Sequence, residues 1–430
     1  MKVFFDTIGC RLNQSEIEKM AAQARANGHE VVARASQADV VIINTCAVTL
    51  AASSDSRMKI RQAARAGCAR IIATGCYATI SPEETGQLPQ VSDIVVNQKK
   101  DELIQSILGA PAAGGKSAES ARVPLPGRQH RTRAFIKVQD GCDNFCTFCI
   151  TRIARGRSVS QTKEEIYRDI AAALMGGAKE IVLTGVNLGS WGRDKPAYGT
   201  LVDLIKGIIA DFSPGRLRLS SLEPWDIDED FLEVLTLPGF CRHLHLPLQS
   251  GSQGVLQRMG RRNTPQDFRV LVENIRKVIP EIAITTDIMV GFPGETEQEF
   301  GEGLEFVHGL GLAGGHVFNF SLRPGTPAER IPERVPPATR KERSERMREV
   351  IESSGLAYQS GFLGKVGQVL WEQAKADNGI WQLEGLTDNY LRIRAAAETC
   401  LQNEFSDVLL LASHNAFVDG RILSGKNEVK

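Results

Sequence analysis

Three cysteines stand close together in the stretch DGCDNFCTFCI at residues 140–150. Cys142, Cys146 and Cys149 are separated by three and then two intervening residues. A structural zinc site or a closed iron–sulfur cluster needs four protein ligands, so this loop leaves one position for another molecule. A Cys₃His zinc site is the alternative, but His130 precedes the motif and no histidine follows at finger spacing. The loop therefore predicts an iron–sulfur cluster with one open iron.

A second group of cysteines is dispersed in sequence. Cys10, Cys46 and Cys76 each lie just past an apolar run that predicts a strand. The carboxyl ends of parallel strands meet at one edge of a sheet, so we expect these three thiols to converge there as ligands. The alternative is that they are small buried core residues. That alternative is our prediction for Cys68, Cys241 and Cys400, which lack such placement.

The elements that must position these cysteines follow from hydrophobic patterning. The first hundred residues alternate short apolar runs with helical stretches, which is typical of a parallel sheet. The C-terminal part changes to strand-like runs at 365–373, 379–395 and 407–423, which predict a small β-barrel. Between them, six strands alternate with helices and predict a partial (β/α)₆ barrel with the quoted motif just past its first strand. These strands are expected at 134–139, 180–185, 216–221, 243–248, 282–291 and 316–321.

The predicted fold class is therefore α/β, with three domains and a linker. We expect an N-terminal domain at 1–108, a linker at 109–127, a barrel domain at 128–360 and a small β-barrel at 361–430. The linker stretch GAPAAGGKSAESARVPLPG is rich in Gly, Ala, Ser and Pro and has no periodicity.

Composition limits the partners. Lys plus Arg and Asp plus Glu both total 51, so any nucleic-acid-binding surface must be a local patch. No signal peptide is recognisable, and no apolar run reaches the roughly 18 residues expected of a membrane span. We therefore expect a cytoplasmic protein without a membrane partner. Its nine cysteines are then expected to be ligands or reduced core residues, not disulfides.

The cysteine spacing resembles that of the radical S-adenosylmethionine (SAM) superfamily, including the aromatic Phe148 between the last two cysteines. The resemblance implies that SAM chelates the open iron. Small and polar residues at the predicted strand ends then fit a cofactor laid across the barrel mouth, although ordinary turn chemistry is the alternative for each glycine. Together with Phe148, the candidate cofactor-binding residues are Gly185, Asn187, Ser221, Glu223, Gln249 and Asp287, with Ser220 beside them.

The whole chain resembles the methylthiotransferase family within that superfamily. The motifs that carry the resemblance are TIGCRLNQSE, NTCAVT, GCYA, DGCDNFCTFCI, RIARGRSVS, GFPGET and RPGTPA. The resemblance implies two [4Fe–4S] clusters. Cys10, Cys46 and Cys76 are expected to hold an auxiliary cluster that delivers sulfur, and Cys142, Cys146 and Cys149 the cluster that cleaves SAM.

The family reaction uses SAM twice, once as a methyl donor to sulfur and once as a radical source. An external electron donor such as flavodoxin or ferredoxin is therefore an expected partner. One local departure is visible, since Thr151, Arg152, Ile153 and Ala154 stand where relatives often carry proline and tyrosine. Arg152 and Ile153 are expected to change which side chains lie next to the target base or the cofactor.

The expected substrate is the anticodon stem-loop of tRNA. Arg11 and Leu12 in GCRLNQ resemble the family type that acts on N6-threonylcarbamoyladenosine. Alternatives are the isopentenyladenosine type, the type that modifies a ribosomal-protein side chain, and a non-catalytic iron–sulfur protein that binds RNA or carries electrons. GLTDNYLRI resembles the small RNA-binding TRAM barrel of tRNA-modifying members. Trp371, Trp381 and Tyr390 there are expected mainly to pack in its core.

A run of basic residues on both sides of the radical motif is a candidate phosphate-binding patch. The alternative is a solvated face without a ligand. The arginines of RIARGR are also candidate partners for the carboxylate of the modified base. The run comprises Arg122, Arg128, Arg131, Arg133, Lys137, Arg152, Arg155 and Arg157.

Overall fold

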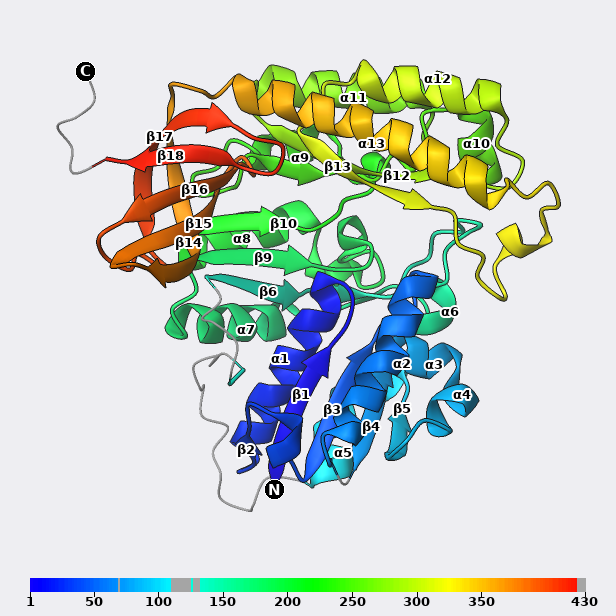
Figure 1. Cartoon of the computed structure of the whole chain (residues 1–430), viewed down its shortest axis with the longest axis vertical. Coiled ribbons are helices and arrows are strands. Elements are labelled where there is room, and N and C mark those ends of the chain that lie inside the picture. Colours follow the sequence, from blue (N-terminus) through cyan, green and yellow to red (C-terminus); the bar gives the residue numbers. More distant parts are fainter. Residues whose placement is uncertain (69, 110–124, 127–131, 424–430) are drawn as a thin grey trace.

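The computed structural model describes residues 1–68, 70–109, 125–126 and 132–423. Figure 1 shows a parallel sheet with its helices at the N-terminus, a central set of strands covered by helices, and a C-terminal barrel that packs beside the central strands. This arrangement confirms the predicted α/β class with a parallel-sheet domain, a partial barrel and a small β-barrel. The boundaries proposed between the domains stay a prediction, and most of the linker at 109–127 lies outside the described residues.

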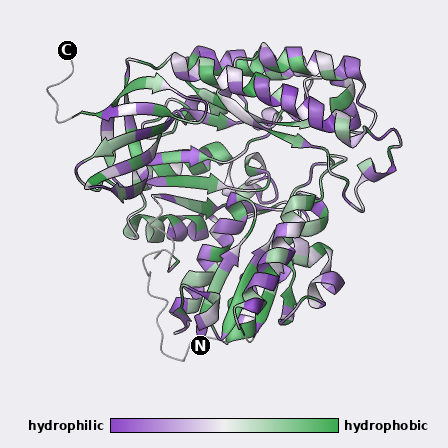
Figure 2. Cartoon of the chain, in the orientation of Figure 1, coloured by the Kyte–Doolittle hydropathy of each residue, from purple (hydrophilic) through white to green (hydrophobic). Residues whose placement is uncertain are grey.

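The N-terminal sheet is parallel and has the strand order β2-β1-β3-β4-β5. Strand β3 is buried at every position, which explains the unbroken apolar run from Val40 to Ile43. Figure 2 shows the same strands as predominantly hydrophobic, with more mixed colours on the helices around them. The strands are β1 (Lys2–Thr7), β2 (Glu30–Val31), β3 (Val40–Thr45), β4 (Ile71–Gly75) and β5 (Val91–Val95), and the helices are α1 (Arg11–Ala26), α2 (Leu50–Arg65), α3 (Cys76–Ile80), α4 (Pro82–Gly86), η2 (Asn97–Glu102) and α5 (Leu103–Leu108).

The central domain contains all six predicted strands. They form two parallel sheets, β10-β9-β6 and β11-β12-β13, and a parallel bridge from Ser221 to His245 joins β10 to β11. The result is an open barrel with one continuous apolar core. The strands are β6 (Arg133–Lys137), β9 (Glu180–Thr184), β10 (Arg216–Leu219), β11 (His243–His245), β12 (Ala283–Val290) and β13 (Gly314–Asn319).

Helices cover the outside of the central strands, and four of them begin with a capping box. In α7, α8, α11 and α12, a threonine and an acidic residue three positions on satisfy each other's backbone amides. The capping residues therefore mark where each helix, and with it the apolar periodicity, begins. The helices are α6 (Thr151–Arg155), α7 (Lys163–Met175), α8 (Leu201–Phe212), α9 (Glu229–Val234), α10 (Gln253–Arg258), α11 (Pro265–Val278), α12 (Glu297–His308) and α13 (Pro337–Ser360).

The C-terminal strands close into a barrel in the order β14-β15-β16-β18-β17. Trp371 lies fully buried in its core and donates from Nε1 to Ser406 Oγ at 2.9 Å, while Trp381 packs against the same core. These contacts confirm core packing for both tryptophans. The strands are β14 (Val366–Asp377), β15 (Ile380–Thr387), β16 (Arg392–Ala397), β17 (Phe405–Ser413) and β18 (Val418–Ile422).

Buried arginines attach this barrel to the central domain. Arg218 pairs with Glu180, at 2.7 Å from Nε to Oε1, and donates to the carbonyls of Thr387 and Asp388. Arg216 donates to the carbonyls of Leu386 and Gln368 in the same way. Both arginines are nearly inaccessible to solvent. The two barrels therefore form one folded unit, because separating them would leave buried cations unpaired.

Two smaller expectations have different outcomes. Cys68 and Cys241 are buried as predicted, but Cys400 is exposed in the turn before β17, so the core prediction for it was wrong. Its neighbours Glu398, Thr399 and Gln402 are polar, which places this turn at the surface. None of the helices in the described ranges is long and apolar enough to cross a membrane.

Candidate functional site

The radical-motif cysteines lie on a loop that follows β7 (Gln139–Asp140) and leads into α6. The backbone amide of Cys142 donates to Gly156 O at 3.1 Å, and that of Cys149 donates to Cys146 O at 3.1 Å. Gly141 has φ +67°, and a Cβ there would stand 1.9 Å from Arg157 O. The tight loop thus requires glycine before the first cysteine, because a side chain would collide with the returning backbone.

Gln139 holds this loop from beneath and was not predicted from the sequence. Its Nε2 donates to the carbonyls of Asp140 and Gly141 and to Ser158 Oγ, all within 2.9 Å. Its Oε1 accepts from the backbone amide of Asn187, at 2.9 Å. A buried glutamine with every polar group paired fixes the cysteine loop relative to the end of β9.

The N-terminal cysteines meet at the carboxyl edge of their sheet, as expected from the strand pattern. Cys10 caps the start of α1, Cys46 follows β3, and Cys76 begins α3 directly after β4. Cys46 is locked in place by Ser56, whose Oγ accepts from its amide and donates to its carbonyl, both at 3.0 Å. The structure therefore brings together three residues that are far apart in sequence.

The thiols of each group are close enough to influence one another electrostatically. Burial raises the pKa of Cys46 to about 11, and the neighbouring Cys10 and Cys76 add to the rise. Burial likewise raises the pKa of Cys142 and Cys146 to about 11, with Cys149 contributing to both. Without a metal, Cys46, Cys142 and Cys146 therefore hold their protons at neutral pH, and a bound cation would have to displace these protons.

Each of the two sites offers three cysteine thiols as its donor set. Across the described ranges, no three His, Cys, Asp or Glu side chains converge closely enough to hold one ion. In a [4Fe–4S] cluster each thiolate binds a different iron, so the sulfur atoms stand farther apart than the ligands of one ion. Two sets of three thiols without a fourth ligand fit two such clusters.

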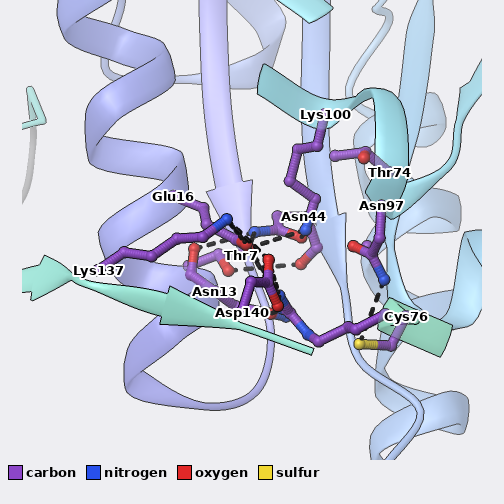
Figure 3. Close-up of polar contacts among 12 residues, drawn as sticks. Thr7, Asn13, Glu16, Asn44, Thr74, Cys76, Asn97, Lys100, Lys137 and Asp140 are labelled. Atoms are coloured by element: carbon purple, nitrogen blue, oxygen red, sulfur yellow. Dashed lines mark hydrogen bonds and ion pairs between the residues drawn. The ribbon is translucent and has the colours of Figure 1, made fainter. Parts of the chain in front are cut away.

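Behind the N-terminal cysteines, a buried ion cluster centred on Glu16 joins the two domains (Figure 3). Lys100 Nζ lies 2.8 Å from Glu16 Oε2, Lys137 Nζ 3.2 Å from Oε1, and Arg155 Nη1 2.9 Å from Oε1. Asp140 accepts from Lys137 and Arg155 and completes the cluster. Because of these cations, the pKa of Glu16 stays well below its usual value despite burial.

Two asparagines connect this ion cluster to the cysteines. Arg155 Nη2 donates to Asn13 Oδ1 at 2.6 Å, and the Cys10 thiol lies 3.9 Å from the same oxygen. Asn97 Nδ2 lies 3.7 Å from Cys76 Sγ and donates to Ala154 O at 2.8 Å. Since Ala154 and Arg155 belong to the helix that follows Cys149, the two cysteine sites are held at a fixed separation.

The predicted cofactor-binding residues lie around the mouth of the barrel, and two have the polar atoms a ligand needs. Asn187 Oδ1 and the neighbouring candidate Ser220 Oγ are buried without a hydrogen-bond partner, at the ends of β9 and β10. Ser221 is half-buried at the bridge to β11. Orphaned polar atoms at this edge fit a bound SAM, which carries hydroxyl, amino and carboxylate groups.

Other predicted residues are already engaged with the protein. Glu223 forms a two-point ion pair with Arg261, at 2.7 Å for the shorter contact, and Arg261 Nη1 also lies 3.9 Å from Cys146 Sγ. Asp287 pairs with His245 at 3.2 Å. Gly185 packs against Gln139, and a Cβ there would lie 2.9 Å from Gln139 Oε1. Their roles toward SAM stay predictions.

Phe148 and Gln249 hold structural positions beside the site. The Phe148 ring meets Phe292 edge-on, with the ring centroids 6.4 Å apart, inside a small apolar cluster. Gln249 has φ +72°, and its backbone pairs with β12 on both sides, donating to Asp287 O and accepting from Met289 N. These contacts shape the site, whereas contact with SAM stays a prediction for both residues.

The structure corrects the basic patch. Lys137 and Arg155 are buried in the Glu16 ion cluster and are therefore unavailable to phosphate. Arg133 pairs with Glu372 of the C-terminal barrel. Arg157 is exposed beside Asp143, and Arg152 lies 4.2 Å above the Phe145 ring. The remaining members Arg122, Arg128 and Arg131, and also His130, lie outside the described residues.

Comparisons with known proteins agree with this geometry. Residues 2–97 match an uncharacterised protein family, UPF0004, and residues 136–307 match the radical SAM superfamily. The threonylcarbamoyladenosine tRNA methylthiotransferase MtaB of Thermotoga maritima is 39% identical, over 86% of this chain and 86% of that protein. The MtaB of Bacillus subtilis is 36% identical, over 91% of this chain and 89% of that protein.

The chain belongs to the radical SAM methylthiotransferase family. A more distant relative is the tRNA-2-methylthio-N(6)-dimethylallyladenosine synthase of Caldicellulosiruptor saccharolyticus, 31% identical over 97% of this chain and 91% of that protein. Among solved structures, the radical SAM methyltransferase TsrM of Kitasatospora setae has a TM-score of 0.57 at 14% identity, covering 88% of this chain and 79% of that chain, and shares the fold alone. The methylthiotransferase is therefore an enzyme whose cofactors are SAM and two [4Fe–4S] clusters.

Proposed function

We propose that this methylthiotransferase adds a methylthio group to C2 of the adenine in N6-threonylcarbamoyladenosine, next to the anticodon of tRNA. The observation that carries the proposal is the pair of three-thiol sites held side by side by the Glu16 ion cluster and Asn97. Two sites serve a reaction that needs both a radical and a sulfur donor. The relatives with 39% and 36% identity are named for that modified nucleoside.

Cys142, Cys146 and Cys149 are the proposed ligands of the cluster that binds SAM, and Cys10, Cys46 and Cys76 those of the auxiliary cluster. When bound, these cofactors supply a carbon radical for an unactivated carbon–hydrogen bond and the sulfur that replaces the hydrogen. The chain itself binds and orients. Arg261, between Cys146 and Glu223, places a buried cation beside the radical site, where it offsets the negative charge of thiolates.

For SAM we propose contacts from Asn187, Ser220 and Ser221 at the strand ends, with Phe148, Gly185, Glu223, Gln249 and Asp287 shaping the surrounding pocket. Asn187 can accept a hydrogen bond from an ammonium group, and the two serines can donate hydrogen bonds to ribose hydroxyls or accept them. The supporting evidence is the unpaired state of the Asn187 and Ser220 oxygens, described above. Each orphan would regain a hydrogen bond on binding.

The target base is proposed to enter beside α6. Phe145 is 72% exposed, and the Arg152 guanidinium lies over its ring. Ile153, which follows Arg152 in α6, is 49% exposed. An exposed aromatic ring next to a planar cation suits stacking against an unpaired base. Arg152 and Ile153, the departure from related sequences, would thus border the base.

The C-terminal barrel is proposed to bind the tRNA backbone. Arg392 and Arg394 project from β16 on its exposed side, and Arg394 stacks on Phe417 with 3.9 Å to the ring centroid. Reversing both charges should weaken tRNA binding and flatten its salt dependence while leaving SAM cleavage intact. For an enzyme that acts on tRNA we propose a cytoplasmic location, with a reductant such as flavodoxin or ferredoxin as its electron donor.

The dimethylallyl (isopentenyl) nucleoside is the second candidate substrate, because a relative at 31% identity is named for it. Arg11, expected to mark the threonylcarbamoyl type, donates from Nη2 to Tyr390 OH at 2.8 Å, and Leu12 is buried. Arg11 therefore links the N-terminal domain to the C-terminal barrel, and neither side chain is free to project into solvent toward a substrate.

The experiment that tests the function begins with tRNA nucleosides from a strain lacking the protein, examined by mass spectrometry. We expect the methylthio form of N6-threonylcarbamoyladenosine to disappear. Purified enzyme is then offered tRNA carrying either modification, together with ribosomal protein as a control. Preferential turnover of dimethylallyladenosine tRNA, or modification of the ribosomal protein alone, would overturn the substrate and leave the reaction class standing.

A further inference from the structure

Arg323 is a buried arginine whose side chain has no hydrogen-bond or ion-pair partner among the described residues. It lies in the loop between β13 and η6 (Pro327–Arg330), and only 6% of its surface is exposed. Its Nε and Nη2 atoms are buried without a hydrogen bond. In the parts of the chain that the structure describes, no carboxylate lies within ion-pair distance of it. By contrast, the buried arginines Arg155, Arg218 and Arg261 each pair with an acid.

An unpaired buried guanidinium is costly, so its persistence calls for a ligand. Burial lowers the pKa of Arg323, and the thiol of Cys46 is the neighbour that offsets part of this effect. The guanidinium therefore lies near Cys46, one of the proposed auxiliary ligands. Because it retains its charge at neutral pH in any ordinary environment, the missing ligand is an anion.

The loop that carries Arg323 is fixed between the two cysteine sites. Thr326 donates from its amide and its hydroxyl to Arg323 O, at 3.2 and 2.7 Å. Ala328 donates to the carbonyl of Thr147, between the radical-motif cysteines, at 2.9 Å. A Cβ on Gly325 would lie 3.3 Å from Ile153 Cδ1 of α6. The loop thus reaches the radical site, the auxiliary site and the proposed border of the base.

We propose that Arg323 binds the carboxylate of the threonylcarbamoyl group and so selects the substrate, an inference that rests on the proposed function. The carbon that receives sulfur must be reached from both cysteine sites, and Arg323 lies near Cys46 on a loop that is hydrogen-bonded to Thr147. The threonyl carboxylate is the anion that distinguishes this base. A guanidinium forms two parallel hydrogen bonds with a carboxylate, which orients the group as well as holding it.

This assignment replaces the arginines of the RIARGR segment. Arg155 is already shared between Glu16 and Asp140. In the Arg323 loop, Ser321 Oγ is a second buried polar atom without a partner. A dimethylallyl group offers no acceptor to either residue, so binding it would leave a buried cation unpaired. The site thereby discriminates against the apolar modification.

The test uses the holoenzyme and two synthetic anticodon stem-loops. One carries N6-threonylcarbamoyladenosine, and the other carries the same nucleoside with its carboxylate capped as a neutral amide. Binding is measured by fluorescence anisotropy and turnover by product mass, for the native enzyme, Arg323→Gln, Arg323→Lys and Arg330→Gln. Arg330 is an exposed arginine at the end of η6 and serves as the matched control. Iron content and SAM cleavage without RNA are measured for each.

We expect the native enzyme and Arg330→Gln to bind the acid form about 10–100-fold more tightly than the amide. Arg323→Gln should bind both forms equally, and Arg323→Lys should recover part of the preference. A preference for the acid form that survives in Arg323→Gln overturns the assignment. Loss of auxiliary iron in that variant with unchanged RNA binding also overturns it, because Arg323 would then support the auxiliary cluster and not the substrate. If the native enzyme turns over the acid form without any preference, the inference fails and the proposed function stands. Failure of the native enzyme on the acid form instead overturns the proposed function.

Discussion

The two cysteine sites are built in different ways. The radical-motif cysteines come from eight consecutive residues, and the loop is shaped by its own turns, by Gln139 and by Gly141. The auxiliary cysteines come from three separate strand ends and depend on sheet register, on Ser56 and on Asn97. The first site is therefore local in sequence, and the second exists only once the whole N-terminal domain has folded.

The largest expected effect separates the two sites by function. Replacing Cys142, Cys146 and Cys149 with alanine should halve the iron of the anaerobically reconstituted enzyme and abolish SAM cleavage. Replacing Cys10, Cys46 and Cys76 should remove the other half of the iron and leave cleavage intact. Iron analysis and detection of 5′-deoxyadenosine check both variants. Full iron content in either one would contradict the ligand assignment.

The next effect concerns the ion cluster that joins the sites. Glu16→Gln leaves Lys100, Lys137 and Arg155 buried with one acid between them, so we expect the free energy of unfolding to fall by about 3–5 kcal/mol. Denaturant titration measures the loss. The control is Glu84→Gln, which breaks a partly exposed pair with Arg57 in the same domain and should cost about 0–1 kcal/mol. Equal losses in the two variants would show that the cluster does not hold the domains.

A smaller effect should fall on the auxiliary site alone. Asn97→Ala removes the contact to Cys76 Sγ and the hydrogen bond to Ala154 O. We expect about 1–2 kcal/mol of destabilisation and faster loss of the auxiliary iron to a chelator. Iron release is followed in the variant that lacks the radical-motif cysteines, so that only one cluster contributes. Gln139→Ala is followed instead in the variant that lacks Cys10, Cys46 and Cys76, where the radical cluster should be released faster.

The comparison also shows what the sequence could predict. The local site, the six central strands and the strand-end cysteines were recognisable because each depends on residues adjacent in sequence. The Glu16 ion cluster was not, since Glu16, Lys100 and Arg155 are ordinary charged residues whose burial arises from the domain contact. For the same reason Arg155 and Lys137 were wrongly assigned to a phosphate patch. Charge alone does not reveal which arginine is buried.

The smallest expected effect lies at the far interface, between the two barrels. The ring of His243 is buried and stacks on Tyr390 with centroids 3.9 Å apart. Burial, with the nearby Arg218 and His245, holds the pKa of His243 well below its usual value. Below about pH 6.5 the unfolded chain takes up a proton that the folded chain refuses, so stability falls as pH decreases.

Replacing His243 with glutamine should remove that part of the acid sensitivity. Between pH 7 and pH 5.5, the native enzyme should lose about 1 kcal/mol more stability than the variant, at equal iron content. Denaturant titrations at both pH values measure the difference. Parallel losses in the two proteins would show that His243 is not the group responsible.

The contact from Arg11 to Tyr390 has a mechanical consequence. Arg11 directly follows Cys10, and its guanidinium ends on a tyrosine in the turn between two strands of the C-terminal barrel. A movement of that turn would therefore be passed through the Arg11 side chain to the first residue of α1. The C-terminal barrel is therefore linked by a single hydrogen bond to the residue beside Cys10, so a displacement of the Tyr390 turn would act directly on the start of α1.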